Sequence, residues 1–299
     1  MMSRTRYLSP ILLVAAALAL AAAGSRIIKI SYEDGRRSGN LRNGPWVYES
    51  NRPDGIVGTV GELKILASRA VLEAPEGKSM QAAEGERTAT FEGGVTVTRG
   101  RLTARGPRLV YSEATGLGVL AGPAEMHQEP AKEGEDPVDV RAGEMSFDVD
   151  TDISTSSGHV VLTSGNQKGW ADRVYYEEER GLAVFTMEEG AVKLVRERKD
   201  GELVIHAPEV RSLTRTRKLI ATGGVKLVDG AITTSGDALF YDDASGEAIV
   251  IGSPARSVNE EEGFKTSGGT LLHNVNKHRV QVYRKPFTLP TEEFKKVDE

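Results

Sequence analysis

Hydrophobic and polar residues alternate in short runs along most of the chain, a pattern that favours strands over helices. Val95 and Val97 follow two glycines in one such run, and Leu109 and Tyr111 stand in the same relation farther on. Successive side chains of a strand point to opposite faces, so residues two positions apart share a face. The alternation therefore predicts an all-β fold, which the 33 glycines and the aromatic content of 6% also favour.

The alternating pattern repeats along the chain without gaps. The runs that begin at Gly93, Gly158 and Gly223 are 65 residues apart (158 − 93 and 223 − 158). A fixed period is typical of a fold built from equivalent units, and it constrains the architecture more than any single motif does. We expect each copy to contain three strands joined by two turns.

Turn-forming residues recur at the same places in each copy. Polar stretches at 112–116, 177–181 and 242–246 all end in glycine, which adopts positive φ without steric cost. Small residues at 103–106 and 233–237 predict a second turn in each copy. Residues 235–239 recur in modified form at 267–271, so the last copy is shortened. Charged or proline-rich stretches at 129–137 and 196–202 predict exposed loops.

These patterns divide the chain into four segments. Two arginines precede an apolar stretch at 11–23, so residues 1–23 are predicted to be a secretory signal peptide, with an uncleaved membrane anchor left open. Residues 24–88 are a degenerate opening β unit, residues 89–285 form the repeat domain, and residues 286–299 form a charged tail. The protein is expected in the periplasm. The absence of cysteine excludes a disulfide framework and cysteine-ligated metal sites.

Charge and motifs argue against several functional classes. Acidic residues outnumber basic ones by 43 to 38, and the basic residues are scattered, which disfavours nucleic acid as a partner. The five histidines are dispersed. Asp148, Asp150 and Asp152 match the start of a calcium loop, but Ile153 replaces its glycine and His159 its final glutamate. We therefore predict no enzyme activity, no cofactor and no metal site.

The order of glycine, alternating strand, small-residue turn, Leu-x-Tyr, polar turn and apolar run resembles the OstA/LptA-like family of periplasmic lipopolysaccharide-transport proteins over residues 89–285. This resemblance implies an elongated, twisted antiparallel β jelly roll with a groove along one open side that holds acyl chains. It also implies lipopolysaccharide or another envelope lipid as ligand, an inner-membrane ABC transporter complex and an outer-membrane protein as partners, and end-to-end association of copies.

The chain is longer than the usual member, which leaves open one extended groove, a fusion of two units, or a bridge combined with a membrane-anchored component. The competing hypothesis is a structural or adhesive envelope protein that binds glycan or protein through its outer face. The middle residues Val110, Tyr175 and Phe240 are also apolar, so the groove-lining face cannot be decided by parity. We assign the groove to the apolar positions that agree across the copies, which are Val95, Val97, Leu109, Tyr111, Val119, Val160, Leu162, Val174, Tyr176, Val184, Val225, Leu227, Leu239, Tyr241 and Ile249.

Overall fold

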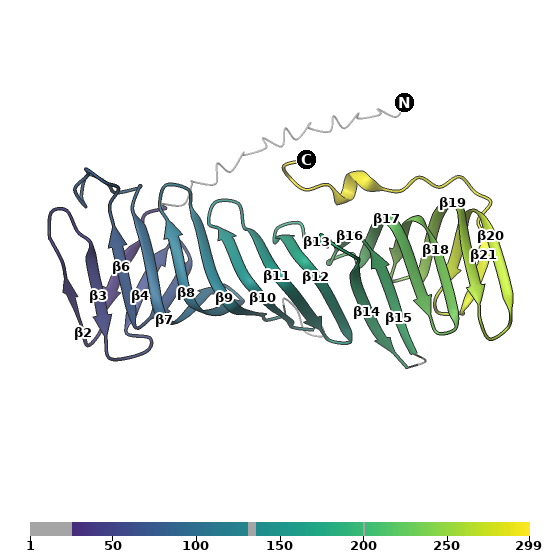
Figure 1. Cartoon of the computed structure of the whole chain (residues 1–299), viewed down its shortest axis with the longest axis horizontal. Helices are drawn as coiled ribbons and strands as arrows, with labels where there is room; N and C mark the ends of the chain where they lie inside the picture. Colours follow the sequence, from purple (N-terminus) through teal and green to yellow (C-terminus); the bar gives the residue numbers. More distant parts are fainter. Residues whose placement is uncertain (1–25, 131–135, 200) are drawn as a thin grey trace, which may run out of the picture.

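The computed structural model describes residues 26–130, 136–199 and 201–299, so the predicted signal or anchor at 1–23 lies outside the described residues. In the described part, 21 strands join in one antiparallel sheet, and the only helical element is the short 3-10 helix η1 (Thr291–Phe294). The molecule is elongated, with its strands running across the long axis (Figure 1). The all-β prediction is confirmed. No helix within these ranges has the length and apolar character needed to span a membrane.

The strands follow one another along the chain, and the longest connection between described strands, residues 74–87, joins β6 to β7. Their bounds are β1 (Lys29–Tyr32), β2 (Gly35–Ser38), β3 (Trp46–Ser50), β4 (Ile56–Val60), β5 (Leu63–Ala67), β6 (Arg69–Glu73), β7 (Thr88–Arg99), β8 (Leu102–Ser112), β9 (Leu117–Gln128), β10 (Val138–Asp148), β11 (Ile153–Ser164), β12 (Gln167–Glu177), β13 (Leu182–Thr186), β14 (Val192–Arg198), β15 (Gly201–Ala207), β16 (Glu209–Leu213), β17 (Lys218–Asp229), β18 (Ile232–Asp242), β19 (Glu247–Asn259), β20 (Phe264–Asn274) and β21 (Arg279–Val282).

The long strands bend in the middle, so that one sheet folds into two layers. The first half of β7 pairs with β6 and its second half pairs with β5, with a register shift at the bend. Layer 1 contains β2, β3, β6, β13, β16 and β21, and layer 2 contains β1, β4, β5, β14 and β15. Each long strand contributes one half to each layer. A continuous hydrophobic core lies between the layers.

Glycines make these bends. Gly93 and Gly94 have φ values of 83° and 85°, and a Cβ on Gly93 would lie 1.9 Å from the Ser68 hydroxyl. The equivalent pairs at 158–159 and 223–224 also have positive φ and sit at register shifts. The predicted turns at 103–106 and 233–237 are wrong, because these residues bend within β8 and β18. Within one 65-residue period the chain therefore crosses both layers four times, instead of forming the three predicted strands.

The glycine-ended turns are confirmed. Gly116, Gly181 and Gly246 have φ between 64° and 75°, and each donates its N–H to the carbonyl four residues earlier at 2.9 Å. The predicted loop at 196–202 is wrong for most of these residues, because β14 continues to Arg198, β15 begins at Gly201, and these two residues pair. Residues 131–135 of the other predicted loop lie outside the described residues. Strands β1 to β6, from the predicted opening unit, extend both layers of the same sandwich.

The long strands are interrupted at the centre of the molecule. Between β12 and β17, layer 1 is formed by β13 and β16, and layer 2 by β14 and β15. Residues 187–191 separate β13 from β14, and Pro208 separates β15 from β16, whereas the long strands continue through a short bend. In Figure 1, β13 and β16 lie above β14 and β15 at this point. The same arrangement occurs in the opening unit, where residues 51–55 separate β3 from β4 and Ser68 separates β5 from β6.

Candidate functional site

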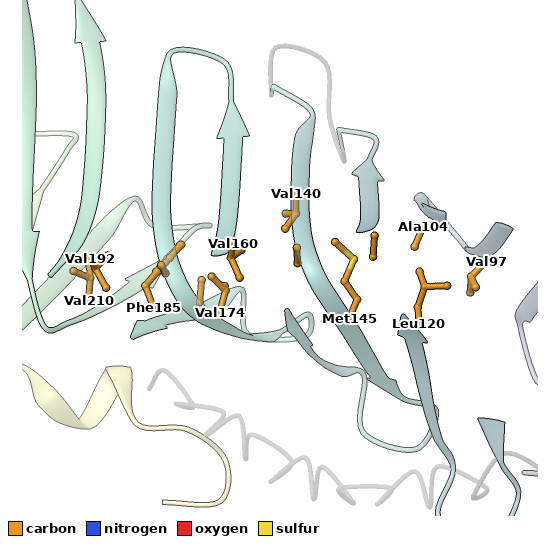
Figure 2. Packing of buried hydrophobic residues seen from close by; sticks show 14 of the residues in the cluster. Val97, Ala104, Leu120, Val140, Met145, Val160, Val174, Phe185, Val192 and Val210 are labelled. Atoms are coloured by element: carbon orange, nitrogen blue, oxygen red, sulfur yellow. The ribbon is translucent and has the colours of Figure 1, made fainter. Parts of the chain in front are cut away.

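A cavity of about 290 Å³ lies between the layers where the long strands are interrupted. Its apolar walls come from both layers, with Leu162, Leu203 and Ile205 facing Val174 and Phe185. Figure 2 shows Val160, Val174 and Phe185 in the row of buried side chains that runs along the sandwich. The other side chains around the cavity are Met126, Gln128, Val138, Val140, Ser154, Ser156, Ser164, Gln167, Lys168, Gly169, Tyr176, Ala183, Leu194, Val195, Arg196, Ser212, Thr214, Arg217, Lys218, Leu219, Tyr241 and Asp243.

The second copy differs from the other two where the cavity lies. Phe91 is fully buried in the first copy, and the residue 65 positions later is Ser156, which lines the cavity. The third copy has Ala221 at this position, which is no larger than serine and is fully buried, so loss of the phenyl ring alone does not leave a cavity. The cavity lies instead in the copy whose long strands are divided into β13 and β14 and into β15 and β16.

Basic side chains dominate the charged part of the cavity lining. Lys168, Arg196, Arg217 and Lys218 line it, against one acidic residue, Asp243. Asp243 forms ion pairs with Arg196 and Arg217. Because the whole chain carries a net charge of −5, this local excess of positive charge is opposite to the average surface. The site has an apolar interior and cationic groups at its margin.

Ion pairs link the strand ends of the two layers on the open side of the sandwich. Arg99, at the layer 2 end of β7, lies 2.7 Å from Asp152 and 3.1 Å from Glu178, both in turns at the layer 1 end. Arg196 of layer 2 reaches Asp243 in the same way. These contacts hold the layers together where no bent strand joins them.

A buried polar chain crosses the sandwich beyond the cavity. Thr234 Oγ1 lies 3.0 Å from His273 Nδ1, and His273 Nε2 lies 3.0 Å from Asp229 Oδ2. Burial would raise the pKa of Asp229, but the hydrogen bond from His273 and the nearby charges of His273, Arg198 and His278 hold it below its ordinary value. The order of hydroxyl, imidazole and carboxylate matches a nucleophile triad.

These three hydrogen-bonded side chains have no route to a substrate, however, because Thr234 and His273 have no exposed surface and Asp229 is 1% exposed. Thr234 belongs to layer 2 and His273 to layer 1, so we interpret the chain as a tie between the layers. Within the described ranges, no group of three or more histidine, aspartate or glutamate side chains is arranged to hold a metal ion.

The structure divides the fifteen predicted groove residues into three sets. Leu162, Val174, Tyr176 and Tyr241 line the cavity. Eight others are buried in the packed interior away from it, namely Val95, Val97, Leu109, Tyr111, Val160, Val225, Leu227 and Leu239. Val119, Val184 and Ile249 lie outside the interior core cluster, on the opposite face of their strands.

The residues of the third set lie outside the interior because each was assigned one position before the inward residue of its strand. The inward position of these strands is one residue later, at Leu120, Phe185 and Val250, all buried in the interior core cluster. These three residues also share the 65-residue offset, so the signal was present in the sequence. Burial raises the pKa of Tyr111, whose hydroxyl donates to the Arg26 carbonyl at 2.8 Å, so this phenol is part of the packing.

No family model matches the chain, and no curated protein matches it. One solved structure that aligns with it is LptH of Pseudomonas aeruginosa, described as the LptA-homologous periplasmic component of the conserved lipopolysaccharide transport device. The alignment has 14% identity and a TM-score of 0.35, and it covers 43% of this chain and 95% of LptH. A likeness of this degree carries no functional assignment, which depends on the chain's own geometry.

Proposed function

We propose that the protein is a lipid carrier of the cell envelope that holds acyl chains in the central cavity. The observation that supports this most directly is an apolar space between two β layers, with cationic side chains at its margin. Each methylene removed from water contributes about 0.8 kcal/mol, so an acyl chain of about twelve carbons faces an aqueous barrier near 10 kcal/mol. A cavity lined by leucine, valine and phenylalanine lowers that barrier.

The proposed ligand is a lipopolysaccharide-type lipid. Acyl chains would lie against Leu162, Val174 and Phe185, and an anionic headgroup would lie near Lys168 and Lys218. Charge-assisted contacts from lysine and arginine are the usual way to bind phosphate or carboxylate groups. The sequence resemblance described above favours the same ligand class.

The proposed setting is the periplasm, where the protein would bridge an inner-membrane ABC transporter complex and an outer-membrane partner. The ends of the sandwich support this role, because β1, β2 and β21 each pair with a strand on one side only. Unpaired edges accept further strands, so copies or partners would add end to end. The interior on either side of the cavity is filled, so passage of lipid along the whole length would require the layers to part at the ion-paired side.

Two neighbouring tyrosines provide a direct test of the cavity. Tyr176 lines the cavity, whereas Tyr175 points to the outer face. A photo-crosslinking amino acid at position 176 is expected to capture lipid in cells, and the same residue at position 175 is not. Mass spectrometry of the crosslinked protein identifies the lipid. Capture at position 175 alone would contradict the proposal and favour the alternative of an envelope scaffold that binds through its outer face.

A cavity-filling variant provides a second test. Gly169 lines the cavity, and a Cβ added to it would approach only Leu194 Cδ2 closely, at 3.0 Å. The Gly169→Leu variant should retain its fold, since a side chain can enter the empty space, and should lose bound lipid by about tenfold or more. Lipid that copurifies with the protein is quantified by mass spectrometry. Trp170→Leu, at the adjacent residue on the other face, is the control, and equal lipid content in both variants would argue against cavity binding.

A further inference from the structure

Residues 283–299 run back from β21 along the outer face of layer 1, toward the centre of the molecule (Figure 1). Within the described residues, this segment forms no ladder with any strand. The Tyr283 N–H donates to the Thr270 carbonyl at 2.9 Å, and the Phe287 ring lies 5.8 Å from that of Phe240. Farther on, the segment is held by one fully buried ring and by side chains of β12, β16 and the turn after β12. We call it the C-terminal segment.

The apolar anchor of this segment is Phe294. Its ring has no exposed surface and packs against Leu182, Val184 and Ile220 on the outer faces of β13 and β17. The partly buried side chains around this pocket are Tyr175, Leu213, Phe240 and Leu289. Burial of one large aromatic side chain in a pocket is the usual anchor in peptide recognition.

Three polar side chains bind the main chain on either side of the anchor. Arg180 donates to the carbonyls of Glu293 at 3.0 Å and Lys295 at 2.6 Å. Arg211 donates to the carbonyl of Phe294 at 3.1 Å, and the Val297 N–H donates to Glu177 at 2.8 Å. Main-chain atoms are the same in every peptide, so these contacts do not distinguish one peptide sequence from another. The anchor residue therefore supplies the selectivity.

A carboxylate provides the second selective contact. Arg211 Nη2 donates to Glu299 Oε1 at 3.0 Å, and its Nη1 contacts the other carboxylate oxygen. The hydrogen bond and charge of Arg211 lower the pKa of Glu299 to about 2. The pocket therefore accommodates an aromatic ring followed, five residues later, by an acidic group.

We propose that the outer face of β12, β13 and β16 is a peptide-recognition surface, and that the C-terminal segment is its releasable resident ligand. The intended occupant is a segment of a partner protein with the same chemistry, an aromatic residue followed five positions later by a carboxylate. The binding groups also have partners outside the segment, because Glu177 lies 2.8 Å from Arg180 and Glu209 lies 2.8 Å from Arg211. A preorganised site of this kind loses little entropy on binding.

The docking surface shares its three strands, β12, β13 and β16, with the cavity. Ala183 and Phe185 of β13 line the cavity from one side, while Leu182 and Val184 hold the Phe294 ring on the other. Replacement of the resident segment by a partner would therefore act on a wall of the cavity. Only this consequence depends on the proposed function, whereas peptide recognition does not.

The test uses the full chain carrying Phe294→Asp, which expels its own segment, and a fluorescent peptide of residues 286–299. The peptide should bind this variant saturably, and about tenfold or more weaker when the peptide carries Phe294→Ala or the protein also carries Arg211→Ala. Protein without the Phe294 substitution should bind the peptide poorly, since its tethered segment competes at high effective concentration. Fluorescence anisotropy measures each affinity.

Release is measured separately with Val184→Cys, because the chain contains no other cysteine. Val184 is 2% exposed beneath the segment, so this thiol should react with a maleimide only when the segment leaves. Protection that persists in the Phe294→Asp variant, or a reactive thiol without peptide binding, would overturn the proposal. If Phe294→Asp does not fold, Phe294→Ala takes its place with the same expected and contrary outcomes.

Discussion

The Leu239→Asp variant is expected to unfold the C-terminal part of the protein, whereas Leu162→Asp is expected to leave it folded. Leu239 has no exposed surface and lies in the packed interior, while Leu162 is partly exposed and faces the cavity. Loss of the leucine side chain alone costs about 2–5 kcal/mol in a packed core. An unpaired buried carboxylate adds several kcal/mol. At position 162, water in the cavity can reach the carboxylate.

Circular dichroism and urea denaturation of the two variants would measure this difference. The expected result is a loss of about 5 kcal/mol or more in the free energy of unfolding for Leu239→Asp, with a much smaller loss for Leu162→Asp. A well-folded Leu239→Asp protein would mean that the layers are open at this position as well. The interior would then be a continuous trough that extends beyond the cavity to Leu239.

The repeat in the sequence predicts the strand class and the glycine-ended turns correctly, because both depend on local chemistry. Alternating apolar residues define strands, and Gly116 or Gly181 is needed where φ is positive. The bends within the long strands do not follow from the sequence in this way. A glycine pair such as Gly93 and Gly94 has the same local signature whether it begins a strand or folds one strand across two layers. Only the pairing of β7 with both β5 and β6 distinguishes these cases.

The candidate site depends on tertiary packing, so the sequence predicts it only in part. Of the residues assigned to the groove, Val174 and Tyr176 line the cavity, whereas their equivalents Leu109 and Tyr111 are packed closed. Agreement across copies identifies the shared architecture, but the cavity arises where the copies differ. The second copy differs in that its strands are divided into β13 and β14 and into β15 and β16.

The C-terminal segment shows a further limit of sequence reasoning. Residues 286–299 are predicted only as a charged tail, yet Phe294 within them is fully buried. Its partners Glu177, Arg180 and Arg211 lie more than 80 positions away in the chain. No local pattern connects these groups, because their arrangement depends on where β12 and β16 lie in the folded sheet.

A second large effect on stability is expected for the Glu113→Gln variant, which should lose about 3–5 kcal/mol in the free energy of unfolding. Glu113 is 1% exposed and pairs with Arg87, which is 6% exposed, at 2.8 Å. Its carboxylate also accepts hydrogen bonds from the N–H groups of Ile28 and Gly85, both at 2.9 Å. It therefore joins both ends of the opening unit, residues 24–88, to the end of β8. Glutamine keeps the shape of the side chain but leaves the Arg87 guanidinium buried without a counterion.

The pH dependence distinguishes loss of charge from loss of packing. Burial would raise the pKa of Glu113, but the hydrogen bonds from Arg87, Ile28 and Gly85 and the charge of Arg87 hold it below the ordinary value of 4.5. A carboxylate with a lowered pKa stabilises the fold above that value, and the contribution is lost as pH falls through the pKa of the folded state. The stability difference between the native chain and Glu113→Gln should therefore be full at pH 7 and shrink below pH 4.5.

Urea denaturation of both proteins at several pH values would measure this difference. Glu92→Gln is the matched control, since Glu92 pairs with Arg69 at an exposed site and its loss should cost about 1 kcal/mol or less. If the Glu113 variant lost no more than this control at pH 7, the buried pair would not hold the opening segment. A difference that stayed constant down to pH 2 would instead assign the effect to packing, because a purely steric defect does not titrate.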